Sequence, residues 1–134
     1  MLVYKHTYQR KGGMIYLNSS NKSEYGEILT RLIKDKKMTQ EVFYKKLGIT
    51  KPYFYEIVSG KINPPPPDTQ IKILRILNPT DADKEKLMDI AARARKELPA
   101  DIMIYLENKS NGLQKIRDDS AYKMFLKEII NKGE

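Results

Sequence analysis

The chain has 134 residues, of which 25 are basic and 17 acidic, so its formal net charge is +8. This length predicts one domain, and the charge favours polyanionic partners such as nucleic acid. The absence of cysteine excludes disulfides and cysteine-based zinc sites. No apolar run approaches the roughly 20 residues that span a bilayer, and the N-terminus lacks the apolar core of a secretion signal. We therefore expect a cytoplasmic protein with no membrane partner.

Residue patterns that carry catalysis are nearly absent. The single histidine, His6, stands near the N-terminus, and the sequence has no Ser/His/Asp set, Gly-rich phosphate loop or paired histidines. Asp81, Asp83 and Glu85 stand close together but lack the glycine and ligand spacing of a calcium loop. Acidic residues in the first turn of a helix explain them more simply. We expect no enzyme, no metal and no cofactor.

The first 22 residues differ in composition from the rest. Residues 2–8 and 14–17 are rich in β-branched and aromatic side chains, and Gly12-Gly13 between them is a turn signal. This pattern predicts a small two-stranded β-hairpin, which is marginal unless it docks on something. The alternative makes residues 1–13 an extension, with Met14 as a second start. A polar linker then leads into a helix expected over residues 24–36.

That helix has an apolar stripe formed by Tyr25, Ile28, Leu29, Leu32 and Ile33. Residues 39–60 then predict two short helices joined by a tight turn, with Thr39 and Thr50 as N-caps and Gly48 in the turn. The inward residues are expected to be Val42, Phe43, Leu47, Phe54 and Ile57, and the outward residues of the second helix to be Lys51, Pro52, Tyr55 and Glu56. Spacing alone suits an ordinary helical hairpin equally well.

The prolines at 64–67 favour a stiff extended spacer, with a ligand for an SH3-like domain as the alternative. Further helices are expected after an Asp68 or Thr69 cap, from Pro79-Thr80, from Pro99, and after a break at residues 110–112. Their apolar faces are expected at Ile71, Leu74, Ile76 and Leu77; at Leu87, Ile90, Ala91 and Ala94; at Ile102, Tyr105 and Leu106; and at Tyr122, Phe125, Leu126, Ile129 and Ile130.

Several segments carry a resemblance to a known family. The matching segments in the motif are Thr39-Gln40, Leu47-Gly48-Ile49-Thr50, Tyr53-Phe54 and Ile57…Gly60-Lys61. They resemble the Cro/repressor-type (XRE) helix-turn-helix family. Beyond the motif, Asn63-Pro64-Pro65, residues 73–77, Ala91…Ala94-Arg95 and residues 97–102 are similar to a bacterial and phage regulator subfamily with extra C-terminal helices. The resemblance covers about residues 24–117.

The resemblance implies an all-α, lambda-repressor-like helix-turn-helix bundle with additional C-terminal helices. We expect an N-terminal extension or hairpin in residues 1–22, the DNA-binding domain in 23–78 and C-terminal helices in 79–134. One position departs from the family pattern, which usually has Ala where this chain has Tyr44. Because the two motif helices approach closely there, a Tyr must swing outward or open the crossing slightly.

A sequence-specific transcriptional regulator, with repression favoured, is the function that the resemblance implies. Gln40 would bind a backbone phosphate, as would Lys61 and Asn63, with Lys36 and Lys37 adding charge. In the major groove, Lys51 would donate to guanine, Glu56 would accept from cytosine, and Tyr55 would contact a thymine methyl or a phosphate, beside the exposed Pro52. Tyr53 is expected to pack. The distribution of charge agrees with a DNA-binding role for this region, because residues 31–61 hold eight basic and three acidic residues.

A single helix-turn-helix domain buries too little surface to recognise a long specific DNA site, so a homodimer is expected. The predicted dimer surface consists of Tyr122, Phe125, Leu126, Ile129 and Ile130; the alternative is that this stripe caps the core of the monomer. A second candidate function is a protein-interaction module, such as an antitoxin or regulatory subunit, whose helix-turn-helix does not read DNA. Steep salt dependence of binding would separate the two, because phosphate contacts release counterions.

Overall fold

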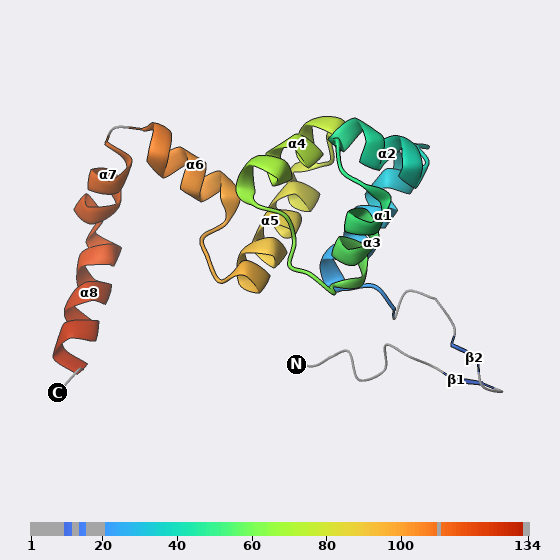
Figure 1. Cartoon of the computed structure of the whole chain (residues 1–134). Helices are drawn as coiled ribbons and strands as arrows, with labels where there is room; N and C mark the ends of the chain where they lie inside the picture. The colour runs from blue at the N-terminus through green and yellow to red at the C-terminus, as the bar shows by residue number, and fades with distance from the viewer. Residues whose placement is uncertain (1–9, 12–13, 16–20, 110, 133–134) are drawn as a thin grey trace. The chain divides into compact units, whose positions relative to one another are not determined.

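The computed structural model describes residues 10, 11, 14, 15, 21–109 and 111–132. From residue 21 onward the described elements are all helices, and the fold class is all-α (Figure 1). The helices are α1 (Glu24–Asp35), α2 (Gln40–Leu47), α3 (Lys51–Ser59), α4 (Pro67–Leu77), α5 (Asp81–Arg95), α6 (Ala100–Asn108), α7 (Gly112–Asp118) and α8 (Ser120–Lys132). The chain divides into two compact units, Met1–Ala100 and Asp101–Glu134.

Two short strands precede the helices. β1 (Arg10–Lys11) and β2 (Met14–Ile15) pair antiparallel, with Arg10 opposite Ile15 and Lys11 opposite Met14. Most of the predicted hairpin, including residues 2–8 and the Gly12-Gly13 turn, lies outside the described residues, as does His6.

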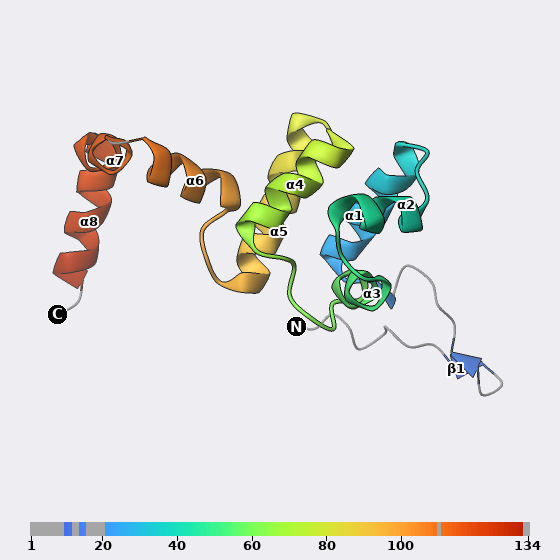
Figure 2. The ribbon, with the colours of Figure 1, turned by 45° about the horizontal axis from the view of Figure 1, so that its top comes forward.

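The first unit is built around one core. α1 packs against α3 and α5, and α2 packs against α4. In Figure 2, α1, α2 and α3 gather on one side of this unit and α4 and α5 on the other. The predicted apolar stripe of α1 is fully buried, as expected. The core consists of Tyr25, Ile28, Leu29, Leu32, Ile33, Phe43, Tyr44, Leu47, Phe54, Ile57, Val58, Ile73, Leu77, Leu87, Ile90 and Ala91.

Helix α1 crosses α3 at a glycine. A Cβ added to Gly26 would overlap with the carbonyl oxygen of Val58, so only glycine fits at this crossing. Ser23 fastens the same point: its backbone N–H donates to the Val58 carbonyl at 2.9 Å and its hydroxyl at 3.1 Å. The Ser23 hydroxyl also accepts from the Gly26 N–H and caps α1. This contact fixes the orientation of α3 relative to α1.

Within the first unit, two residues expected on buried helix faces are exposed; on α6, Ile102 and Tyr105 are exposed as well. Val42 is 44% exposed. The buried face of α2 is formed by Phe43, Tyr44 and Leu47, and Val42 lies about 100° from Phe43 around the helix axis, on the side away from that face. Ala94 is also exposed. It lies in the last turn of α5, where it lines an open pocket together with Ser23 at the start of α1.

The C-terminal half differs from expectation at two helix boundaries. α4 begins at Pro67, so Asp68 and Thr69 lie inside it and not at its cap. Proline suits the first helical position, since the N–H that it lacks would have no partner there. The expected last helix is two helices, α7 and α8, separated by Asp119 in an extended conformation. The Asp119 carboxylate accepts from the Tyr122 N–H at the start of α8.

Candidate nucleic-acid interface

The α2–turn–α3 unit forms as the sequence predicts. The Thr39 hydroxyl accepts from the Val42 N–H at 3.1 Å, and the Thr50 hydroxyl accepts from the Tyr53 N–H at 3.3 Å. Gly48 has a φ of 84°, which reverses the chain in the left-handed region at little cost for glycine. The two short helices are therefore each capped and joined by a defined turn.

Tyr44 does not swing outward. It is 9% exposed, and its ring centroid lies 5.6 Å from that of Phe54, while the ring centroid of Phe43 lies 5.9 Å from that of Phe54. The three rings form an aromatic core between α2 and α3. A backbone approach that only glycine permits lies at Gly26, between α1 and α3.

The outer face of α3 presents most of the predicted base-contacting residues. Lys51, Pro52 and Tyr55 are exposed, with Tyr55 at 44%, whereas Glu56 is only half-exposed. Pro52 lies in the first turn of α3, where its fixed φ is compatible with a helix. Tyr53 is half-buried against the core, as expected.

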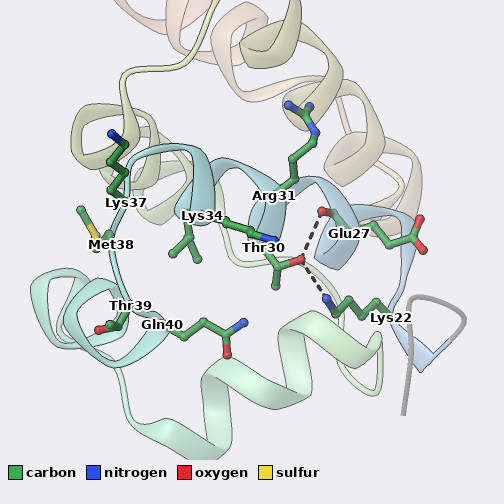
Figure 3. A pocket seen from close by; sticks show the side chains of 10 residues that line it. Lys22, Glu27, Thr30, Arg31, Lys34, Lys37, Met38, Thr39 and Gln40 are labelled. Carbon is green, nitrogen blue, oxygen red and sulfur yellow. Dashed lines mark hydrogen bonds between the residues drawn. The ribbon is translucent and has the colours of Figure 1, made fainter. Parts of the chain in front are cut away.

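A side-chain hydrogen bond joins this face to the start of α2. The Tyr55 hydroxyl donates to Gln40 Oε1 at 3.2 Å. With its oxygen accepting from Tyr55, the Gln40 amide keeps both N–H donors for another partner. Figure 3 shows the amide nitrogen of Gln40 on the side of a groove and its oxygen toward α3. Gln40 and Tyr55 therefore form one continuous polar surface.

That groove, of about 680 Å³, opens between α1 and the start of α2 (Figure 3). Its lining residues are Lys22, Glu27, Thr30, Arg31, Ile33, Lys34, Lys37, Met38, Thr39 and Gln40. We call it the α1–α2 groove. Four of these residues are cations and one is an acid, so an anion in the groove meets a positive surface. The positive end of the α2 dipole lies at its rim.

The cations of the groove differ in what already binds them. Arg31 forms ion pairs with Asp35 at 3.3 Å and with Asp83 at 3.0 Å. The Lys22 ammonium donates to the Thr30 hydroxyl at 3.3 Å. Within the described part of the chain, Lys34 and Lys37 form no ion pair. Neither Lys22 nor Lys34 was among the residues predicted to contact DNA; Lys34 lies one turn after the buried Thr30 on α1.

The remaining predicted phosphate contacts occupy different places. Lys36 ends α1 and is exposed, but it does not line the groove. Lys37 lines the groove from a left-handed backbone conformation with φ 56°. Lys61 and Asn63 are exposed beyond the C-terminal end of α3, and Asn63 lines a separate pocket with Gly60. The structure thus brings Gln40, Tyr55 and Lys37 together.

An ion pair changes the charge of α2. The Lys45 ammonium lies 2.8 Å from a Glu41 carboxylate oxygen, one turn away. This hydrogen bond and the charge of Lys45 lower the pKa of Glu41, and the same contact raises the pKa of Lys45. Lys45 is thereby paired, whereas Lys34, Lys37 and Lys51 form no ion pair within the described residues.

The predicted dimer residues lie on α8 in the second unit. Phe125, Leu126, Ile129 and Ile130 are exposed, and Tyr122 is half-buried.

Other site types find no support in the part of the chain that the structure describes. It contains no group of three or more acidic or histidine side chains placed to hold a metal ion. None of its helices combines the length and apolarity needed to cross a membrane. Comparisons with protein-family models, curated proteins and solved structures found no significant match.

Proposed function

We propose that the chain is a sequence-specific DNA-binding transcriptional regulator, of the Cro/repressor type that the motif resembles, which lays α3 in the major groove. The observation that carries this proposal is the hydrogen bond from Tyr55 to Gln40. It places the exposed face of α3, the start of α2 and the lysine-lined α1–α2 groove on one continuous surface. Base contacts need such a helix face, and phosphate contacts need the flanking cations.

In this arrangement each side chain has a separate role. The Gln40 amide donates to a phosphate and sets the register of α3 on the duplex. Lys51, at the first position of α3, donates to guanine N7 or O6, and Glu56 accepts from cytosine N4. Tyr55 orients Gln40 through its hydroxyl, and its ring contacts a thymine methyl or a phosphate of the duplex.

The proposal is tested by binding to a pool of randomised duplexes at two salt concentrations. Wild type is compared with the double variant Lys51→Ala/Glu56→Ala. A matched control, Glu85→Ala/Lys86→Ala, removes the same two charges from exposed positions on α5. We expect wild type and the control to enrich the same sequence, and the α3 variant to lose or change that preference. Affinity of wild type should fall steeply with salt.

Weak binding to all duplexes, unaffected by the α3 substitutions, would contradict the proposal. It would favour the alternative of a protein-interaction module, in which α3 is a structural helix.

A further inference from the structure

Helix α8 carries large apolar side chains on one exposed face. Phe125 is 59% exposed, Leu126 40%, Ile129 49% and Ile130 63%, and Tyr122 is half-buried. At about 100° per residue these five side chains fall within a stripe roughly 140° wide. We call them the α8 stripe. No residue of α8 is buried.

A helix of this kind needs a partner surface. α8 has 13 residues, and isolated helices shorter than about 12–15 residues are marginal in water. The second unit as a whole, residues 101–134, is smaller than the roughly 40 residues below which domains rarely fold unaided. α7 adds the exposed side chains of Leu113 and Ile116. The stability of α8 must therefore come from covering its stripe.

We propose that a second copy of this chain covers the α8 stripe and that the protein is a two-fold dimer held through α8. The four exposed side chains Phe125, Leu126, Ile129 and Ile130 present on the order of 400 Å² per copy, since aromatic and large aliphatic side chains each offer about 150–200 Å². A pair of stripes with flanking atoms covers about 1,000 Å², which is the lower limit for a specific interface.

The five stripe residues include no charged side chain, so two identical stripes can face each other without burying a charge. A two-fold pair uses the same face of both copies, so the contact closes and does not propagate into a chain-like assembly. The choice of a second copy rests in part on the proposed function, because a dimer joins two reading heads for two half-sites on one duplex.

The test measures the mass of the full chain without DNA, by light scattering after size exclusion. Wild type should have twice the chain mass of 15.6 kDa. Phe125→Glu/Ile129→Glu should reduce the mass to that of one chain. Met124→Glu is the matched control: Met124 is 67% exposed on α8, on the side away from the stripe. It should remain dimeric. Wild type at the mass of one chain, or equal loss of dimer in the control, would overturn the proposal.

A second measurement needs no variant. Amide hydrogen exchange in α8 of wild type should slow as the protein concentration rises, because a second copy protects the helix only when bound. Exchange that does not depend on concentration would mean that α8 is covered within its own chain or not at all, and would overturn the proposal.

DNA binding separates this proposal from the proposed function. Phe125→Glu/Ile129→Glu should still prefer the same half-site sequence but bind a two-half-site duplex roughly tenfold or more weakly, as expected for loss of a linked second site. Lys51→Ala/Glu56→Ala should lose sequence preference and keep the dimer mass. Failure of either proposal therefore leaves a different pattern.

Discussion

Tyr44 is an integral part of the interior of the first unit. Its ring packs at 5.6 Å from Phe54, and the side chain is 9% exposed. Replacing it with alanine, the residue that the family resemblance places there, leaves a cavity the size of an aromatic ring. We expect Tyr44→Ala to lower the free energy of unfolding by about 3 kcal/mol, as large-to-small core substitutions do. Urea unfolding followed by circular dichroism measures this change.

Tyr44→Phe is the control for that substitution. Within the described structure the Tyr44 hydroxyl forms no hydrogen bond, so its removal should change the free energy of unfolding by less than about 0.5 kcal/mol. Equal stability of Tyr44→Ala and wild type would show that the ring is not part of the core.

At the same scale, the sequence located local features better than contacts between elements. Caps at Thr39 and Thr50 and the turn at Gly48 follow from chemistry within four residues, and the structure has all three. The Tyr55–Gln40 hydrogen bond joins residues 15 positions apart, so no local pattern indicated it. Lys22 reaches the α1–α2 groove from the segment before α1, where its ammonium donates to the Thr30 hydroxyl eight residues away, and no local pattern indicated that contact.

Among the elements, the crossing of α1 and α3 depends on Gly26. In most helices Gly→Ala is stabilising by about 1 kcal/mol. Here the added methyl would meet the Val58 carbonyl oxygen, which already accepts two hydrogen bonds from Ser23. Because the Cβ is fixed rigidly to the backbone of α1 and the carbonyl belongs to the backbone of α3, the two helices must separate. We expect Gly26→Ala to lower the free energy of unfolding by about 2 kcal/mol or more, measured by urea unfolding.

Gly112 provides the comparison. A Cβ at Gly112 would have its nearest neighbour, Leu106 Cδ2, at 3.4 Å, which is an ordinary contact. Gly112→Ala at the start of α7 should therefore leave the free energy of unfolding within about 0.5 kcal/mol of wild type. If Gly26→Ala were equally harmless, the close crossing of α1 and α3 would be wrong.

The helices themselves were largely predictable because their apolar residues repeat with the helical period. The buried stripe of α1 shows this directly. The exact ends of the helices were less predictable. Proline is tolerated at the first position of a helix, so α4 can begin at Pro67, but the run of four prolines does not indicate which of them begins the helix. Ala94 is exposed in the last turn of α5, where it lines an open pocket, and periodicity does not encode that opening.

At the scale of the whole molecule, the net charge of +8 does not by itself locate a binding site; the positions of cations without an ion pair are also needed. Lys45 is paired with Glu41 and Arg31 with Asp35 and Asp83, whereas the α1–α2 groove holds Lys34 and Lys37 without an ion pair in the described structure. Under the proposed function this groove receives a phosphate of the duplex backbone. The total charge could not have identified that place.

The groove lysines should therefore govern salt dependence and not sequence preference. Each neutralised phosphate contributes about one unit to the slope of log affinity against log salt concentration. We expect Lys22→Gln and Lys34→Gln each to reduce that slope by about one unit and to weaken binding to all duplexes alike. Lys86→Gln, an exposed substitution on α5 with the same change of charge, should leave the slope nearly unchanged. Binding titrations at several salt concentrations measure this slope. If all three substitutions reduced the slope equally, the salt dependence would come from the net charge of the chain and not from the α1–α2 groove.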